Sequence, residues 1–415
     1  MILAAKSAWN RRGTLALILI SIILSTVLLA GLERLRTQVR ASFVQSIAGT
    51  DLLAGARGSS LQLVLYAVFH LGGASSNMGW EKAREIAAYP ETAWTVPLSL
   101  GDTHRGFPVV ASDENLWTHF RWQRDRKLTL ASGRPFEGLF EVVLGAETAR
   151  RLGYRLNQNI VLAHGSGEAA RQHDDKPFIV TGILSPTGSP ADRSLFISLE
   201  SMEAIHLDWR GGAPLPGLKI KAEDVRKFNL TPKSITALMI GLKNRRQVFA
   251  VQSRIQAAPG EPLTAVLPGV ALDQLFSLLG NGEKILFLVS ILVTVTGLLG
   301  LAAAILAGLG ERRRELAVLR SLGASPWDIL ILISLESLWL TLLGLVIGVI
   351  ALAGIIAAAG PWLLTNYGAA LELSPPTQRE LVILAGILAA GLLTGLGPAV
   401  RAYYFSLNDG LSGRI

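Results

Sequence analysis

Residues 285–309 read ILFLVSILVTVTGLLGLAAAILAGL, a run of about 25 residues without a charged side chain. An α-helix rises about 1.5 Å per residue, so about 20 apolar residues are enough to cross the roughly 30 Å hydrocarbon core of a bilayer. Shorter apolar segments belong to buried helices of soluble domains. This stretch therefore predicts a membrane-spanning helix and an integral membrane protein.

Three further long apolar runs lie at residues 14–32, 329–359 and 381–400. A cleaved signal peptide is the alternative for the first run. Its apolar core is usually about 7–15 residues long and ends at a site of small residues. Residues 14–32 are longer and lack a convincing cleavage site, so we expect this helix to stay in the protein. The sequence predicts four transmembrane helices, one near the N-terminus and three close together near the C-terminus.

The composition agrees with a membrane location. Half of the residues are hydrophobic and 17% are charged, against about 25% in an ordinary soluble chain. The net charge of +8 also suits nucleic acid, but many basic residues flank the apolar runs, as at Lys6, Arg11, Arg12, Arg312, Arg313, Arg314, Arg401 and Arg414. Such clusters are typical of cytoplasmic flanks. We therefore expect no nucleic-acid partner, both termini in the cytoplasm, and residues 33–284 on the outer side.

The expected domain organisation follows from these spans. Its parts are a cytoplasmic flank with the first span (1–32), an extracytoplasmic domain (33–284), the second span (285–309), a cytoplasmic loop (310–328), the third span (329–359), a short outer loop (360–380), the fourth span (381–400) and a cytoplasmic tail (401–415).

The extracytoplasmic domain alternates short strand-like and helical segments, as in the strand-like residues 178–184 and the helical residues 80–89. This mixture predicts an α+β domain, and the Pro- and Gly-containing residues 185–192 suggest a break between two lobes. Residues 61–71 (LQLVLYAVFHL) are too short to cross a membrane. We interpret them as a buried core element, with a face that touches the membrane or an apolar substrate as the alternative.

Signatures of catalysis are absent from the sequence. It contains no G-x-x-x-x-G-K-[ST] phosphate loop, no H-E-x-x-H zinc motif, no G-x-S-x-G elbow and no cysteine. His164 and His173 with Asp174 and Asp175 have metal-ligating side chains, but any polar loop supplies such residues. We therefore expect a non-catalytic chain with no catalytic residue, no metal and no cofactor of its own.

Glu336 lies within the third apolar run. Ionisable residues inside membrane spans are rare because burying their charge is costly, and they are functional candidates by default. The alternative is structural, because a glutamate near the cytoplasmic end can reach water or pair with a neighbouring protomer. Glycines one turn apart, at Gly344 and Gly348 and again at Gly391 and Gly395, permit close helix packing.

The loop between the second and third spans, GERRRELAVLRSLGASPWD (residues 310–328), has helical periodicity. Leu316, Leu319 and Leu322 give it one apolar side, while charged residues from Glu311 to Glu315 supply the other. Gly323 is placed to end this helix. An amphipathic helix at the inner face either lies among lipid headgroups or docks into a groove on a cytoplasmic protein.

The same loop resembles the signature of the FtsX/MacB-like family of ABC transporter permeases. The matching residues are Arg313, Glu315, Leu316, Ala317, Leu319, Arg320, Ser321, Leu322, Gly323 and Ala324. Residues 143–153 and 178–184 are similar to the family's outer-domain elements, and residues 398–411 are similar to its closing motif.

The resemblance implies a permease subunit in the bacterial inner membrane, with a periplasmic domain and without a fused ATPase. A separate ABC ATPase subunit would bind ATP and magnesium and dock on a coupling helix comprising Glu311, Arg313, Arg314, Glu315, Leu316, Leu319, Arg320, Leu322, Gly323 and Ala324. Further expected partners are the lipid bilayer, a second permease protomer in a homodimer or heterodimer, and a periplasmic adaptor or lipoprotein.

Three functions are then open. The first is mechanotransmission that exports or extracts a lipophilic or peptidic substrate or a lipoprotein. The second is regulation of a periplasmic enzyme such as a cell-wall hydrolase, without transport. The third is an ATP-independent membrane sensor.

Overall fold

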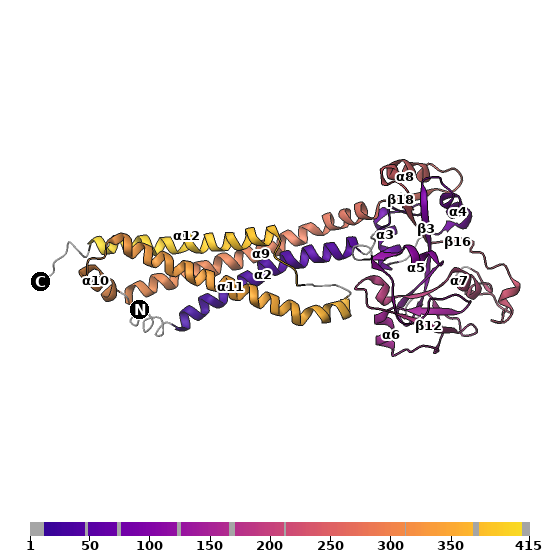
Figure 1. Ribbon diagram of the computed structural model, residues 1–415, viewed down its shortest axis with the longest axis horizontal. Helices are drawn as coiled ribbons and strands as arrows, with labels where there is room; N and C mark the ends of the chain where they lie inside the picture. The colour runs from indigo at the N-terminus through magenta and orange to yellow at the C-terminus, as the bar shows by residue number, and fades with distance from the viewer. Residues whose placement is uncertain are drawn as a thin grey trace. The chain divides into compact units, whose positions relative to one another are not determined.

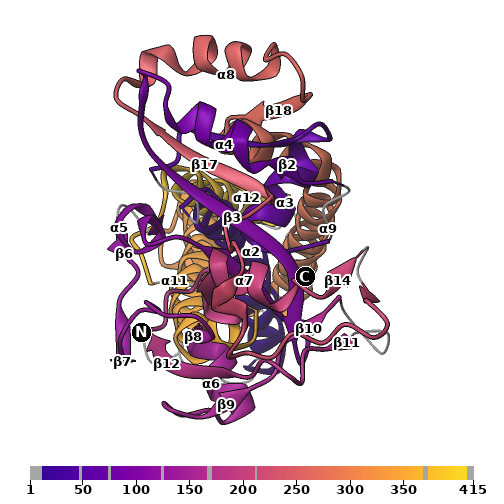
Figure 2. The ribbon, with the colours of Figure 1, turned by 90° about the vertical axis from the view of Figure 1, so that its right-hand side faces the viewer.

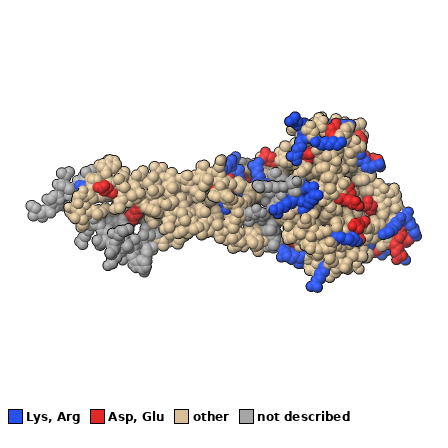
Figure 3. Space-filling model, in the orientation of Figure 1, with Lys and Arg blue, Asp and Glu red and all other residues tan. Residues whose placement is uncertain are grey.

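The computed structural model describes residues 12–45, 49–72, 76–122, 126–165, 171–210, 213–311, 313–367 and 373–408 (Figure 1). The chain forms two compact units. The helical unit comprises residues 1–39, 279–362 and 371–415, and the outer domain comprises residues 40–278 and 363–370. On the face shown in Figure 3, charged side chains gather at the ends of the helical unit, and its middle is free of them.

The helical unit is built from long helices, which are α2 (Arg12–Gln45), α9 (Pro268–Glu311), α11 (Pro326–Tyr367) and α12 (Gln378–Asn408), with the short α10 (Arg313–Ser321) between α9 and α11. Each long helix contains a segment able to span a membrane, namely Ala16–Gln38, Gly282–Ala307, Pro326–Leu363 and Gln378–Tyr404. The predicted four transmembrane helices are therefore confirmed. The helices also extend past the apolar runs, because their polar flanks keep the helical backbone bonds.

The first glycine pair brings α11 against α2. A Cβ atom built on Gly344 would lie 2.6 Å from Ile22 Cγ2, and one built on Gly348 would lie 2.7 Å from Thr26 Cβ. Both distances are too short for real Cβ contacts. Small residues are therefore required here for the two backbones to approach, as expected where lipid gives no hydrophobic drive for helix association.

The second glycine pair, Gly391 and Gly395, brings α12 against α11. A Cβ on Gly391 would overlap Thr341, and a Cβ on Gly395 would overlap the hydroxyl of Ser337. These hydroxyls donate hydrogen bonds to backbone carbonyls of their own helix at 2.8 Å, so they need no partner across the interface. The close approach predicted from glycine spacing occurs at both pairs.

The outer domain is a mixed α/β fold. Its strands are β1 (Leu52–Ala56), β2 (Met78–Gly79), β3 (Thr92–His104), β4 (Phe107–Ser112), β5 (Arg121–Trp122), β6 (Arg126–Lys127), β7 (Leu130–Gly133), β8 (Glu141–Leu144), β9 (Asn159–Ile160), β10 (Ala163–His164), β11 (Arg171–Gln172), β12 (Phe178–Leu184), β13 (Leu195–Ser198), β14 (Trp209–Arg210), β15 (Ala213–Pro214), β16 (Ser234–Ile235), β17 (Ala237–Leu242) and β18 (Leu263–Val266). Its α-helices are α3 (Ser60–Phe69), α4 (Trp80–Ala87), α5 (Asn115–His119), α6 (Ala146–Leu152), α7 (Leu199–Ile205) and α8 (Val248–Gln256).

Among the described residues, 12 strands form one sheet whose main path runs β18-β1-β17-β3-β4-β13-β8-β12-β7. Both faces of this sheet are covered. Leu52 and Ala54 of β1 join one apolar core with residues of α4, α6, α7 and α8, while Leu53 between them joins a second core with α3 and α5. Burial on both faces explains why strands such as β13 and β17 are almost wholly apolar.

The long strand β3 joins the two halves of the sheet (Figure 2). Its first half pairs with β17 and its second half with β4. The expected lobe boundary at residues 185–192 is wrong, because β12 and β13 on either side of it both pair with β8. Its Pro and Gly residues form a connection within one sheet, where Asp192 accepts backbone bonds from Thr187 and Gly188.

The apolar segment at residues 61–71 is the core element that we expected. It forms α3, whose residues Val64, Ala67, Val68 and Phe69 are buried in the second core. Ser59 caps the start of the helix, and His70 ends it in a left-handed conformation with φ of 55°.

Substituting a packed glycine should weaken the helical unit more than substituting an open one. We expect Gly395→Ala to lower stability by about 1–3 kcal/mol, because the new methyl group overlaps Ser337. The matched control is Gly386→Ala on the same helix, where a Cβ meets nothing within 4 Å. The thermal unfolding midpoint of the detergent-purified protein, followed by tryptophan fluorescence, measures both effects. Equal midpoints for the two variants would contradict this packing.

Candidate functional site

The short helix α10 lies in the loop between α9 and α11, and hydrogen bonds fix the conformation of its C-terminal end. Gly323 takes φ of 98°, which is left-handed and favours glycine. The Ala324 amide donates to the Leu319 carbonyl at 3.1 Å, and the Gly323 amide donates to the Arg320 carbonyl at 3.0 Å. These two bonds form a Schellman motif, which satisfies carbonyls that a helix end would otherwise leave open.

The start of α11 is also fixed by hydrogen bonds. Ser325 Oγ accepts from the Asp328 amide at 3.3 Å, while the Asp328 carboxylate accepts from the Ser325 amide at 2.7 Å. This reciprocal pair is a capping box, and Pro326 occupies the first helical position, where its missing N–H is not needed. Only a few residues therefore separate α10 from α11, and the turn between them is fully hydrogen-bonded.

The apolar residues of α10 do not all face one way. Leu316 packs against the helix bundle together with Ile305 and Ile329. Leu319 is 39% exposed, and Leu322, in the turn, is 79% exposed. Leu316 therefore holds α10 on the bundle, while Leu319 and Leu322 stay accessible.

Other large apolar side chains of this loop and of the start of α11 are exposed as well. We define the apolar loop surface as Val318, Leu319, Leu322 and Trp327, of which Val318 is 57% and Trp327 is 61% exposed. Trp327 also packs edge-on against Tyr403 of α12, with ring centroids 5.5 Å apart. This surface is therefore attached to the bundle as well as open to solvent.

The other predicted docking residues occupy the same loop. Glu311 ends α9, Arg313, Arg314 and Glu315 open α10, and the side chains of these four residues lie outside the described part of the structure. Arg320 is half-buried, and its guanidinium donates to the Ala324 carbonyl at 3.0 Å, which reinforces the turn. Glu336 lies in the third turn of α11 and is half-buried.

A buried ion pair at the opposite end of the helical unit was not predicted. Arg34 of α2 donates to both carboxylate oxygens of Glu380 at the start of α12, at 3.1 Å and 2.9 Å. Only 8% of Arg34 and 2% of Glu380 are exposed. Arg34 also donates to the Ser374 carbonyl at 3.0 Å. The bidentate geometry fixes α2 against the start of α12.

Next to this pair lies a cavity of about 540 Å³ between α2, α9 and the start of α12. Apolar side chains such as Leu32, Phe287 and Ile383 line it together with charged ones. Among the charged residues, Arg36 pairs with Glu283 at 2.7 Å. The cavity therefore combines an apolar lining with charged groups.

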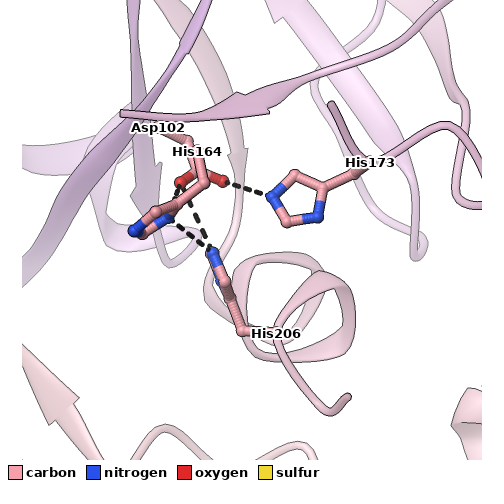
Figure 4. Close-up of side chains that lie close together, drawn as sticks. All are labelled: Asp102, His164, His173 and His206. Atoms are coloured by element: carbon pink, nitrogen blue, oxygen red, sulfur yellow. Dashed lines mark hydrogen bonds and ion pairs between the residues drawn. The ribbon is translucent and has the colours of Figure 1, made fainter. Parts of the chain in front are cut away.

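In the outer domain, a cluster of histidines surrounds one aspartate (Figure 4). His164 and His173 do converge, but with Asp102 and His206 instead of Asp174 and Asp175. Asp174 is exposed, and Asp175 pairs with Lys176. Sequence spacing held no sign of this cluster, because its members come from β3, β10, the loop before β12 and the end of α7.

The cluster shifts the titration of its members. Burial alone would raise the pKa of Asp102, but the three histidines around its carboxylate hold it well below its ordinary range. Burial would lower the pKa of His206, but contact with the Asp102 carboxylate raises it above its ordinary value. The aspartate is therefore a carboxylate that attracts positive charge, which either protons or a bound cation can supply.

Known families match most of the chain. Residues 13–258 match the family described as MacB-like periplasmic core domain, and residues 287–407 match the family described as FtsX-like permease C-terminal. No curated protein matches. The predicted resemblance is therefore confirmed over both the outer domain and the C-terminal helices.

Two solved structures are similar, each at 10% sequence identity. One is the periplasmic region of MacB from Actinobacillus actinomycetemcomitans, with a TM-score of 0.35, covering 56% of this chain and 95% of that one. The other is the extracellular domain of the ABC-type transporter YknZ from Gram-positive bacteria, with a TM-score of 0.32, covering 52% of this chain and 99% of that one.

The Arg34–Glu380 pair should be important for the stability of the helical unit. We expect Arg34→Ala to lower stability by about 3–5 kcal/mol, because it leaves the Glu380 carboxylate buried without its partner. Arg379→Ala is the control, because Arg379 is 73% exposed and lies 3.8 Å from Glu33, so its loss should cost at most about 1 kcal/mol. Thermal unfolding in detergent distinguishes the two, and a similar small effect for both would refute the structural role of the pair.

Proposed function

Because the chain belongs to the family of ABC transporter permeases with a MacB-like periplasmic core domain and an FtsX-like C-terminal region, we propose that it transmits conformational change from a separate cytoplasmic ATPase to its periplasmic domain. In this proposal both termini and the α10 loop lie in the cytoplasm, as the basic flanks of the spans predict. The partner ATPase binds ATP and magnesium, and this chain is its non-catalytic membrane subunit.

The observation that carries the proposal is the apolar loop surface. Val318, Leu319, Leu322 and Trp327 expose large apolar side chains at the end of the bundle where arginines also cluster. Exposed apolar groups rimmed by charge are typical of a protein interaction site. Capping on both sides of the turn makes the surface rigid, so a partner that moves it moves α10 and α11 rather than bending a loose loop.

Contacts inside the helical unit connect this surface to the opposite end of the bundle. Leu316 and Trp327 attach the loop to the bundle, and the glycine pairs seat α11 against α2 and α12. At the far end, the Arg34–Glu380 pair fastens α2 to α12. A shift imposed at α10 is therefore shared by these helices. Coupling in this sense is a bias that the ATPase places on two arrangements of one packed unit.

The cavity near Arg34 favours a lipophilic cargo over regulation without transport. Its volume of about 540 Å³ lies in the range of small-molecule pockets. Its apolar lining suits acyl or other apolar chains, and its acidic and basic side chains, such as Glu283 and Arg379, suit a polar or peptidic head group. We therefore propose export or extraction of an amphiphilic substrate, such as a lipopeptide or lipoprotein.

A charge on the apolar loop surface should disconnect the ATPase. We expect Leu319→Asp to reduce co-purification with the ATPase partner at least tenfold, because burying an unpaired carboxylate at an interface costs more than about 1.4 kcal/mol. For the measurement, the two subunits are co-expressed and solubilised in detergent. This chain is then captured, and the amount of ATPase bound to it is quantified.

The matched control is Leu218→Asp, the same change at an exposed leucine of the outer domain. It should leave binding of the ATPase unchanged. Full binding by a folded Leu319→Asp protein would remove the docking role of α10 and with it the proposed coupling.

A further inference from the structure

We propose that Asp102, His164, His173 and His206 form a binding site for a divalent transition-metal ion of the zinc type in the outer domain. The site is independent of the coupling described above, and it uses residues from four separate segments of the chain (Figure 4).

The spacing of the candidate ligand atoms fits a tetrahedral site. Zinc binds imidazole nitrogen and carboxylate oxygen at about 2.0–2.2 Å, which places neighbouring ligand atoms about 3.3–3.5 Å apart. His206 Nε2 lies 3.4 Å from Asp102 Oδ1, and His173 Nε2 lies 3.5 Å from Asp102 Oδ2. His164 Nδ1 lies closer, at 3.0 Å from His206 Nε2 and 2.7 Å from Asp102 Oδ1, so this ring moves outward by less than about 1 Å when an ion enters. All four ligand atoms fall within 4.8 Å of one another.

The backbone delivers these side chains through defined features. Asp102 lies in a register shift of β3, next to Gly101 with φ of 148°. Such bulges redirect side chains and are frequent beside functional sites. His164 of β10 is the direct cross-strand partner of Asp102. The β3–β10 pairing therefore brings the first two ligands together.

The other two ligands are positioned by hydrogen bonds of their own segments. The His173 amide donates to the Leu162 carbonyl at 2.8 Å, which fixes the loop before β12. His206 is the C-cap of α7, and its Nδ1 lies 2.8 Å from the Met202 carbonyl. A carbonyl at this position accepts the Nδ1 proton and leaves the Nε2 lone pair free, as in many metal-binding histidines.

Several polar atoms in the cluster have no hydrogen-bond partner. The His173 side chain is fully buried, yet neither of its ring nitrogens makes a hydrogen bond, and Asp102 Oδ2, which faces Nε2 at 3.5 Å, makes none either. Buried polar atoms are nearly always satisfied in folded proteins, so each exception needs an explanation. A metal ion among these atoms satisfies His173 Nε2 and Asp102 Oδ2 together.

The surroundings admit an ion. His164 and His206 are 32% and 25% exposed, which gives an ion access from solvent, while Asp102 and His173 close the inner side. The buried Lys176 ammonium is already paired with Asp208 at 2.9 Å. Trp209 packs on His173 with centroids 4.3 Å apart and restricts that ring.

The donor set selects the metal class and the role. Three imidazoles and one carboxylate suit zinc and similar transition metals, whereas magnesium prefers oxygen ligands in octahedral geometry. Four protein ligands leave no open position, which is typical of structural zinc. The ion would therefore cross-link β10, the β12 loop and α7 to β3, and would stabilise the outer domain.

Zinc binding by the full-length, tag-free protein in detergent tests this proposal. The protein is stripped with a chelator and titrated with zinc against a chromogenic competitor, and bound zinc is counted by mass spectrometry. His164→Gln and His206→Gln change the two partly exposed ligands, and His119→Gln is the control, because His119 stacks on Trp94 outside the cluster. We expect one zinc per chain in the wild type and the control.

Each ligand variant should lose at least about 100-fold in zinc affinity, because even second-sphere changes cost about 10- to 100-fold. Zinc should also raise the unfolding midpoint of the wild type, and magnesium should not. Failure of the wild type to bind zinc, unchanged affinity in both variants, or an equal shift with magnesium would each overturn the site. The first of these results would assign the cluster to a proton-linked Asp–His network.

Discussion

The hydrocarbon core of a membrane offers no hydrogen-bond partner, and this constraint determines how the helical unit of this protein is built. Backbone groups are satisfied by making every span a helix, and the helices then associate through shape. The paired glycines of α11 and α12 let neighbouring helices approach to distances that a Cβ would forbid. A buried charge survives only with a partner, which is the physical reason for the bidentate contact of Arg34 with Glu380.

The same rigidity gives a mechanism for coupling. A bundle packed on glycines and fastened by a buried ion pair does not absorb a push at one end by local rearrangement. The apolar loop surface is held by the Schellman motif and the capping box, so it is a stable place for a partner to act. In the proposed function the ATPase changes the relative stability of two arrangements, and the membrane helices carry the difference to the outer domain.

The sequence predicted those features that depend on local pattern. Apolar runs located the four spans, and residues 178–184 gave β12 with the bounds expected. Contacts between residues far apart in the sequence could not be predicted from these local patterns. Arg34 and Glu380 are separated by most of the chain, and Asp102 meets three histidines only because of strand register and a bulge. The difference in exposure between Leu316 and Leu319 likewise depends on how α10 packs on its neighbours, and the sequence periodicity does not show this.

The most direct test of the transmission account is a distance measurement between the outer domain and the helical unit in the complex with the ATPase. The chain has no cysteine, so single cysteines at the exposed positions Glu137 and Arg379 take spin labels without background. Pulsed electron spin resonance then compares the nucleotide-free and ATP-trapped complexes. The account predicts a different distance distribution in the two states, and the Leu319→Asp protein mixed with the ATPase and ATP should keep the nucleotide-free one. The same distribution in both nucleotide states would contradict it.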